Sequence, residues 1–101
     1  MEIRIRYIDG CANRRMAEER VREVLHAVGG DDPAHVILER VESDDAAQRL
    51  GLQGSPTILI DGADPFAMEG AAFGLTRRVY RTEAGLEGSP SLAQLRSVLA
   101  A

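Results

Sequence analysis

The chain has 101 residues, of which 45% are hydrophobic, and this is enough apolar material for one core without disulfides or a structural metal. Its 12 basic residues are all arginine, and 16 acidic residues outweigh them to give a formal net charge of -4. This balance argues against general binding to nucleic acid or to an anionic membrane. We expect a single domain over residues 1–101.

The sequence shows no sign of a membrane span or a leader. No apolar run approaches the roughly 18 residues that a spanning helix needs, and Met1-Glu2-Ile3-Arg4 is unlike a charged and then apolar leader. The single cysteine, Cys11, cannot form an internal disulfide, and no histidine stands near it at metal-ligand spacing. We therefore expect a soluble cytoplasmic protein that makes no membrane contact and binds no metal or cofactor.

The first two elements are a strand and a helix that follow each other directly. Apolar residues alternate with arginines over about residues 2–8, which is the period-two pattern of a strand with one buried face. From Arg14 the apolar residues recur at helical spacing, until Gly29-Gly30 ends the pattern. This pattern predicts an amphipathic helix with one face toward the core.

The middle of the chain reads as strand, helix and strand. The apolar run that opens at residue 36 predicts a second strand ending near residue 41. Ser43 is placed as the N-cap of a short helix, and Gly51 is placed as its C-cap. Residues 57–60 predict a third strand between a proline and an Asp-Gly turn.

The end of the chain adds one strand and one helix. Residues 79–82 predict a fourth strand, and the spacing of Ser91 and Gln94 predicts a capping box at the start of the last helix. The predicted order is β-α-β-α-β-β-α, an α/β fold. Residues 63–77 form an unusually long connection between two adjacent strands.

Cys11 stands where the first strand meets the first helix. The first N–H groups of a helix lack intrahelical partners and carry partial positive charge, which favours a thiolate over a thiol. Arg14 and Arg15 follow closely and are candidates to stabilise the thiolate or to hold an anionic group. Cys11 is therefore a candidate nucleophile, and the alternative is an inert thiol in a fold kept for binding.

The element order, Cys11 after the first strand and Gly54-Ser55-Pro56-Thr57 before the third strand together resemble the thioredoxin/glutaredoxin superfamily. The resemblance covers nearly the whole chain. It implies a thioredoxin-like fold with a four-stranded mixed sheet and helices on both faces. It also implies a cis peptide bond before Pro56, beside Cys11, and substrate contacts from Ser55, Pro56 and Thr57.

Further short motifs are similar to a group of short, single-cysteine thioredoxin-family proteins, sometimes labelled organomercurial-lyase-like. These motifs are Asp9-Gly10-Cys11-x-Asn13-x-Arg15, Asp61-Gly62, Asp64-Pro65-Phe66 and Arg78-Val79-Tyr80-Arg81-Thr82. In dithiol members of the superfamily a second cysteine stands three positions after the first, and here Arg14 occupies that position. Reduction through an internal disulfide is therefore excluded.

The resemblance implies a monothiol thiol-disulfide oxidoreductase, in which Cys11 attacks a disulfide and an external thiol resolves the mixed disulfide. The partner would be a protein or small-molecule thiol or disulfide, with glutathione as a candidate cosubstrate. One alternative is a non-catalytic binding or assembly module with a thioredoxin fold. Another is an oxyanion reductase of the arsenate type, because Cys11-x-x-Arg14-Arg15 loosely resembles the active-site turn of such reductases.

The long connection at residues 63–77 is more apolar than a typical solvated loop. Phe66, Met68 and Phe73 suit either a lid over Cys11 or packing on the chain's own sheet or on a second subunit, so a homodimer is one expectation. Arginines at its end are candidates for an anion site or, alternatively, for a solvated strand face: Arg77, Arg78 and Arg81.

Overall fold

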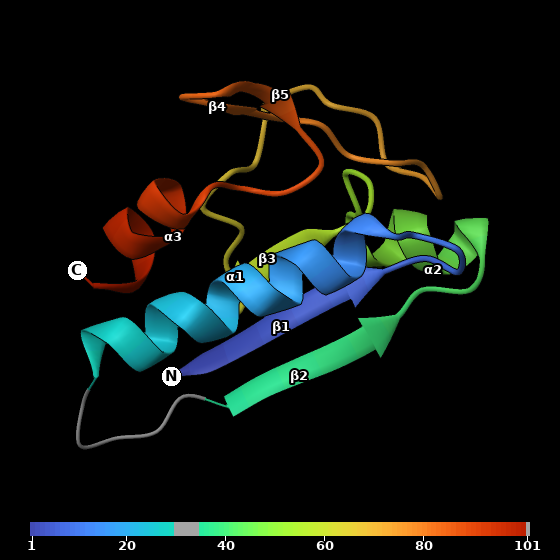
Figure 1. The fold of residues 1–101 in the computed structure, drawn as a ribbon. Helices are drawn as coiled ribbons and strands as arrows, with labels where there is room; N and C mark the ends of the chain where they lie inside the picture. Colours follow the sequence, from blue (N-terminus) through green and yellow to red (C-terminus); the bar gives the residue numbers. More distant parts are fainter. Residues whose placement is uncertain (30–34, 101) are drawn as a thin grey trace.

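The computed structural model describes residues 1–29 and 35–100. The chain is an α/β protein, as predicted, and Figure 1 shows its elements. In order they are β1 (Glu2–Tyr7), α1 (Asn13–Val28), β2 (His35–Arg40), α2 (Asp44–Leu50), β3 (Thr57–Ile60), β4 (Tyr80–Thr82), β5 (Gly85–Glu87) and α3 (Leu92–Leu99). The helix α1 ends beside Gly29, whereas Gly30, the other half of the predicted stop, lies outside the described residues. None of the helices in the described ranges is long and apolar enough to cross a membrane.

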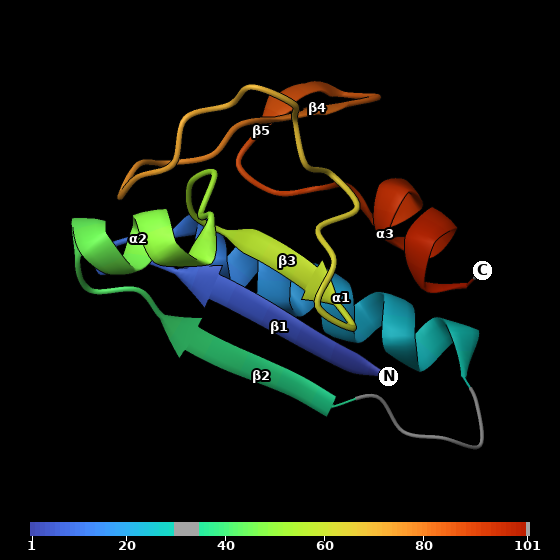
Figure 2. The same ribbon diagram turned by 180° about the vertical axis from the view of Figure 1, so that it is seen from behind.

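The main sheet is mixed and has three strands in the order β2-β1-β3. β1 pairs in parallel with β2, so that Ile5 lies opposite Leu38, and antiparallel with β3, so that Ile5 lies opposite Ile58. The parallel pair needs a crossover connection, and α1 provides it. β1 is therefore the central strand, with β2 and β3 on its two sides (Figures 1 and 2).

The predicted fourth strand forms but does not join this sheet. β4 pairs antiparallel with β5 in a separate two-stranded hairpin, with Tyr80 opposite Glu87, so the expected four-stranded sheet is corrected to three strands among the described residues. The segment just before β4 contacts the chain next to the main sheet, where the Arg78 N–H donates to the O atom of Ser55, two residues before β3 begins. The Arg78 side chain lies against Thr57, and β4 pairs with the next strand, β5, instead of with the main sheet.

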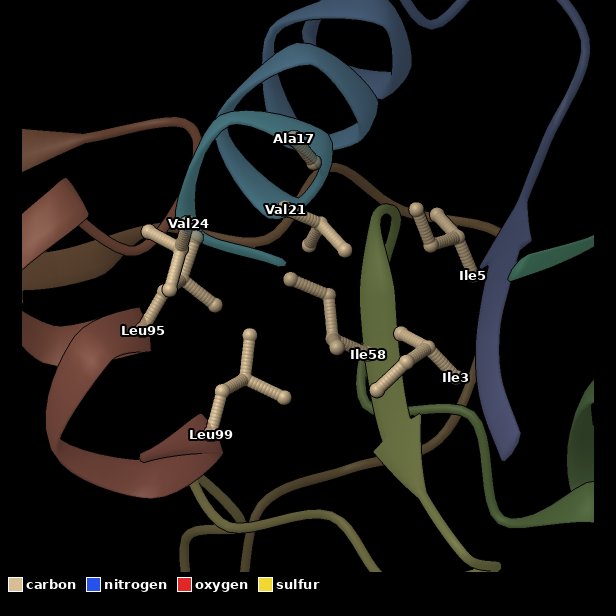
Figure 3. Packing of buried hydrophobic residues seen from close by; sticks show 8 residues of the cluster. All are labelled: Ile3, Ile5, Ala17, Val21, Val24, Ile58, Leu95 and Leu99. Carbon is tan, nitrogen blue, oxygen red and sulfur yellow. The ribbon is translucent and has the colours of Figure 1, made fainter. Parts of the chain in front are cut away.

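The main core lies between the sheet and two helices, α1 and α3, which cover the same face (Figures 1 and 3). Apolar side chains of β1 and β3 meet those of the two helices there, and each member is at most 4% exposed. The members are Ile3, Ile5, Ala17, Val21, Val24, Ile58, Leu95 and Leu99. Removing these side chains from water is the main driving force for assembling the sheet and the two helices.

The short helix α2 lies near the end of β1, on the face opposite α1 (Figure 2). Arg6 points to that face, because it neighbours the core residue Ile5, and its guanidinium donates to Leu50 O of α2 at 3.4 Å. A second, smaller apolar cluster fills the space beneath α2. Its buried members are Val41, Ala47 and Leu52. Helices therefore lie on both faces of the sheet.

The caps predicted for the two short helices are confirmed. Ser43 Oγ accepts a hydrogen bond from Ala46 N–H at 3.1 Å, and Gly51 ends α2 in the left-handed conformation with a φ of 70°. At α3, Ser91 and Gln94 form the complete capping box. Each cap satisfies backbone groups at a helix end that have no intrahelical partner.

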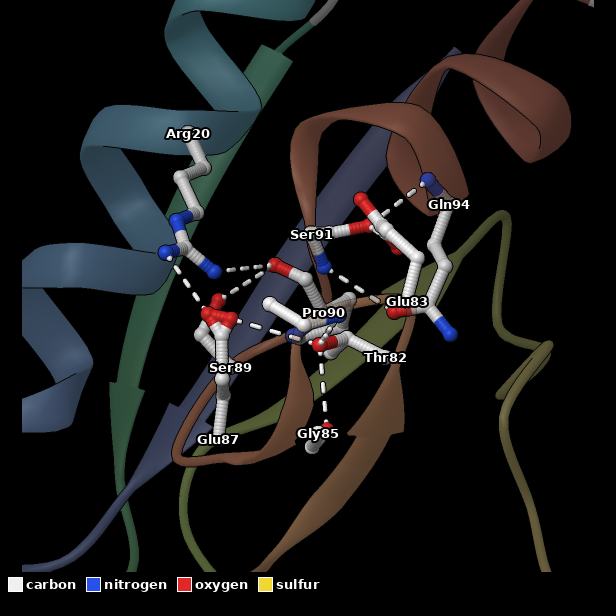
Figure 4. Close-up of polar contacts among 10 residues, drawn as sticks. Arg20, Thr82, Glu83, Gly85, Glu87, Ser89, Pro90, Ser91 and Gln94 are labelled. Carbon is white, nitrogen blue, oxygen red and sulfur yellow. Dashed lines mark hydrogen bonds and ion pairs between the residues drawn. The ribbon is translucent and has the colours of Figure 1, made fainter.

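A polar network attaches the β4–β5 hairpin to α1 and to the start of α3 (Figure 4). Arg20 of α1 donates to Pro90 O at 3.0 Å and to Glu87 Oε1 at 3.1 Å. Ser91 Oγ donates to Glu83 Oε2 at 2.8 Å. The hairpin is thus held by side chains from neighbouring helices rather than by strand pairing with the main sheet.

Candidate functional site

Cys11 lies between the end of β1 and the start of α1 and is partly exposed. Its N–H donates to Ile8 O at 3.3 Å, and its C=O accepts from Arg14 N–H at 3.2 Å, which holds the turn in place. No described side chain caps α1, which begins after Ala12 and has no acidic residue in its first turn. The partial positive charge of the helix N-terminus therefore remains uncompensated beside the thiol.

The thiol opens onto the surface. Cys11 lines an open hollow of about 390 Å³ formed by the β1–α1 junction and a β2 side chain. The other lining residues are Tyr7, Ile8, Asp9, Gly10, Ala12, Arg14 and Arg40. A neighbouring hollow of about 420 Å³ is lined by Cys11, Ala12, Arg14 and Arg15. These volumes are in the range of small-molecule sites.

The two arginines expected to serve Cys11 differ in their surroundings. The Arg14 guanidinium lies 5.0 Å from the centre of the Tyr7 ring and 3.3 Å from Glu18 Oε1. Arg15 is exposed and lines the second hollow. Because Arg14 already has a carboxylate and an aromatic ring as neighbours, Arg15 is the freer of the two to meet an incoming anion.

Sequence reasoning missed a third arginine at this site. Arg40, at the end of β2, forms ion pairs with Asp9 at 3.2 Å and with Glu42. The carboxylate of Asp9, and to a smaller extent that of Glu42, raises the pKa of Arg40. Because β1 and β2 are parallel, their C-terminal ends lie side by side, with Tyr7 opposite Arg40. Recognising this parallel pairing would have placed Arg40 near Cys11.

Ser55 and Pro56 lie beside the turn that carries Cys11, and the bond between them is cis, as the resemblance implies. Ser55 Oγ accepts a hydrogen bond from Ile8 N–H at 3.0 Å, and Ile8 O in turn accepts from Cys11 N–H. Both Ser55 and Pro56 are fully buried. Ser55 is therefore connected to the Cys11 turn through the backbone, in a supporting position.

The backbone of Ser55 already has partners within the chain. Its N–H donates to Thr76 O at 2.7 Å, and its C=O accepts from Arg78 N–H at 2.9 Å. Thr57 is buried as well, and its hydroxyl donates to Gly54 O at 2.6 Å. The backbone groups through which Ser55 would make the substrate contact expected from the resemblance are thus paired with the chain's own segment in this structure.

Arg78 is part of a buried cluster and does not form an anion site with Arg14. Its guanidinium donates to Asp64 Oδ2 at 2.7 Å, to Thr57 Oγ1 at 3.2 Å and to Phe66 O. It also stacks 4.6 Å from the centre of the Tyr80 ring. The side chains of Arg78 and Asp64 are only 6% and 14% exposed, so each charge is neutralised by the other.

Tyr80 links this cluster to the cis proline. Its hydroxyl donates to Pro56 O, and burial raises the pKa of Tyr80 well above its ordinary value. The positive charge of Arg78 opposes this rise, whereas the negative charges of Asp64 and of an ionised Cys11 add to it.

The three residues predicted as a possible lid, Phe66, Met68 and Phe73, lie in different places. Phe66 packs on the main core and meets Tyr80 edge to face, with ring centres 5.8 Å apart. Phe73 is 42% exposed, and its C=O accepts from the Gln48 side chain of α2 at 2.8 Å; Met68 is 64% exposed. In the described part of the chain, none of the three lines the hollows at Cys11. Phe66 thus follows the alternative of packing on the chain's own fold.

Among the described residues, no group of three or more His, Cys, Asp or Glu side chains is arranged to hold a metal ion. Comparison of the chain with protein-family models, with curated proteins and with solved structures finds no match. An account of function therefore depends on the geometry around Cys11 and on the residues that support it.

Proposed function

We propose that the chain is a thioredoxin-like monothiol protein that exchanges thiols and disulfides through Cys11. The observation that carries the proposal is a partly exposed cysteine, Cys11, that lines an open hollow at the start of α1. The cis Ser55–Pro56 bond and its hydrogen-bonded link to the Cys11 turn support the thioredoxin-like assignment. The helix N-terminus supports reactivity, because it favours the thiolate.

The chemistry is two successive thiol-disulfide exchanges. The Cys11 thiolate attacks one sulfur of a disulfide, the S–S bond breaks, and the other sulfur leaves as a thiolate that takes a proton from water. An external thiolate then attacks the mixed disulfide, and Cys11 leaves as a thiolate again. One external thiol becomes part of a new disulfide for each thiol released, so the electrons balance without another reductant.

A small anionic disulfide, such as one containing glutathione, fits this site better than an extended peptide does. The backbone of Ser55 is already paired with Thr76 and Arg78, which removes the edge on which an extended peptide would align. Arg15 is exposed at the second hollow and is suited to a carboxylate. The substrate class that follows is a disulfide that contains a negatively charged low-molecular-weight thiol.

The test is transfer of the glutathionyl group from a glutathionylated peptide to reduced glutathione. Cys11→Ser is expected to lower the rate to that of the uncatalysed reaction while the urea unfolding midpoint stays unchanged, because Cys11 is partly exposed and outside the core. Equal rates for the wild-type protein and Cys11→Ser would contradict the proposal.

A matched control moves the thiol without removing it. In Cys11→Ser/Ser97→Cys the new cysteine replaces an exposed residue in the last turn of α3, at the opposite end of a helix from its N-terminus. This variant is expected to have no transferase activity and to react more slowly with iodoacetamide at neutral pH than the wild-type protein does. Equal alkylation rates would show that the position of Cys11 does not activate its thiol.

A non-catalytic binding module is the second candidate, and the occupied Ser55 backbone is the observation that favours it. In this case the exposed Met68 and Phe73 are the residues to contact a partner. A wild-type protein without transferase activity, together with a partner that is retained by Cys11→Ser and lost by Met68→Ser/Phe73→Ser, would favour the module over the enzyme.

A further inference from the structure

The strand β2 forms an open edge of the main sheet. It pairs only with β1 among the described residues, and Figures 1 and 2 show it at the outside of the sheet. The N–H of His35 donates toward β1, to Met1 O at 3.0 Å. Because the direction of backbone groups alternates along a strand, the N–H and C=O groups of Val36, Leu38 and Arg40 point away from β1.

The centre of this edge is apolar. Val36, Ile37 and Leu38 follow each other, and Leu38 faces the same side as the core residue Ile5, with which it is paired. Leu38 is nevertheless 38% exposed, because no described strand lies beyond it. Charged side chains protect natural strand edges, and in β2 they stand at the C-terminal end, at Glu39 and Arg40. The apolar residues before them form a stretch of open edge that is a template for pairing with another strand.

We infer that β2 pairs antiparallel with β2 of a second copy of this chain, joining the two sheets into one. A two-fold axis through Ile37 places Ile37 opposite Ile37 of the second copy, and Val36 opposite Leu38 of the second copy. The pair of Val36 and Leu38 uses the backbone groups that point outward, so the hydrogen-bond pattern fits this register. The same register places His35 opposite Glu39 of the second copy, so that polar residues face each other; the Glu39 carboxylate of each copy keeps its ion pairs with Arg4 and Arg6 of its own chain.

The neighbouring registers match less well. An axis through Leu38 places Ile37 opposite the carboxylate of Glu39. An axis through Glu39 places Leu38 opposite Arg40 of the second copy, so the apolar side chains no longer face each other. The order of side chains along β2 therefore favours the axis at Ile37, where the apolar pairs are kept together.

The proposed interface is small. β2 has six residues, and one strand edge buries less than the roughly 1,600 Å² of a standard stable interface. We expect a dissociation constant on the order of ten micromolar. The partner is thus a second copy of the chain at moderate concentration, held by backbone hydrogen bonds and by the burial of Leu38.

The first experiment is sedimentation analysis from about 1 to about 500 µM, a range that brackets the expected constant, with a reductant present to prevent disulfides through Cys11. The wild-type protein is expected to shift from monomer to dimer, and Leu38→Glu is expected to remain a monomer. Leu86→Glu is the matched control, because Leu86 is 70% exposed on the separate hairpin, and it is expected to dimerise like the wild type. A monomeric wild type, or equal effects of the two substitutions, would overturn the inference.

The second experiment tests the register in the Cys11→Ser background, which makes it independent of exchange chemistry. Ile37 opposite itself is a non-hydrogen-bonded pair with Cα atoms about 4.5 Å apart, which suits a disulfide. Ile37→Cys is therefore expected to form a disulfide-linked dimer on mild oxidation. Leu38→Cys is expected to stay largely unlinked, because the two copies of residue 38 would lie diagonally about 7–8 Å apart. The reverse result would overturn the register.

Discussion

The two outer edges of the main sheet are finished differently. On the β3 side, the chain's own segment returns and Ser55 exchanges backbone hydrogen bonds with Thr76 and Arg78, while the Arg78 side chain bonds to Thr57. On the β2 side, the outward backbone groups of the strand have no partner among the described residues. The comparison shows that a returning segment with one buried arginine covers the start of the β3 edge, whereas nothing described covers the β2 edge.

Covering the start of the β3 edge depends on buried charged and polar groups, whereas the open β2 edge depends on none. The closed edge depends on a buried ion pair between Arg78 and Asp64 and on a glycine that lets the two segments approach. Such groups are costly when one partner is removed. Substitutions on the β3 side are therefore expected to lower the free energy of unfolding much more than substitutions of exposed residues.

The largest expected effect comes from Arg78→Ala. It leaves the carboxylate of Asp64 buried without its cation, and removal of one partner of a buried pair costs about 3–5 kcal/mol. Urea unfolding measures the change in the free energy of unfolding. The control is Arg77→Ala, which alters an exposed neighbour and is expected to change that free energy by less than about 0.5 kcal/mol.

A double substitution separates the ion pair from simple packing. Arg78→Met/Asp64→Leu removes both charges and is expected to be less destabilising than Arg78→Ala, because no charge remains buried alone. If Arg78→Ala and Arg77→Ala proved equally mild, the closed edge would not depend on the buried pair.

Gly54→Ala tests the close approach of the two segments. Gly54 has a φ of +110°, and a Cβ placed there would lie 3.0 Å from Arg78 Cβ and 3.1 Å from its Cα. We expect a loss of about 2 kcal/mol or more in the free energy of unfolding, from backbone strain and crowding together.

Gly62→Ala is the matched control for the strain. Gly62 also has a positive φ, +87°, but a Cβ there would meet nothing within 4 Å. The expected loss is about 1 kcal/mol, from the backbone conformation alone. Equal losses at the two glycines would show that crowding against Arg78 contributes nothing.

The smallest of these effects is expected for Ser55→Ala. The substitution removes the acceptor of Ile8 N–H and leaves that donor without its partner, which costs about 1 kcal/mol. Urea unfolding and faster hydrogen exchange at the Ile8 amide are the measurements. Ser97→Ala, at an exposed position of α3, is the control and is expected to change stability by less than about 0.5 kcal/mol. Unchanged exchange at Ile8 would contradict the proposed link to the Cys11 turn.

Elements with a clear apolar pattern or cap residues were predictable, whereas β5 and the pairing of β4 were not. Residues 57–60 and both capped short helices lie where the apolar runs and cap residues place them. β5 was missed, because three residues beginning with Gly85 show no alternation. The assignment of residues 79–82 to the sheet was wrong, because a strand pattern does not say which strand is its partner.

Some residues of the candidate site were likewise predictable from the sequence, and others were not. Cys11 at a strand-to-helix junction was predictable from local patterns, and the Arg14–Glu18 pair follows ordinary helical i, i+4 spacing. The roles of Arg78 and Asp64 were not predictable, because the two residues pair across 14 positions of irregular chain. Arg78 was expected either in an anion site or on a solvated strand face, and neither holds, because its burial with Asp64 gives it a structural role.

By itself the sequence determined the α/β class, the helix caps and the placement of one thiol at the start of α1, since each depends on residues a few positions apart. Only the tertiary structure decided that the segment carrying Arg78 covers the start of the β3 edge and that β2 has no second neighbour among the described residues. Whether a sheet edge is covered depends on which residues far apart in the sequence satisfy a buried donor or charge, and the local pattern of apolar residues does not predict these partners.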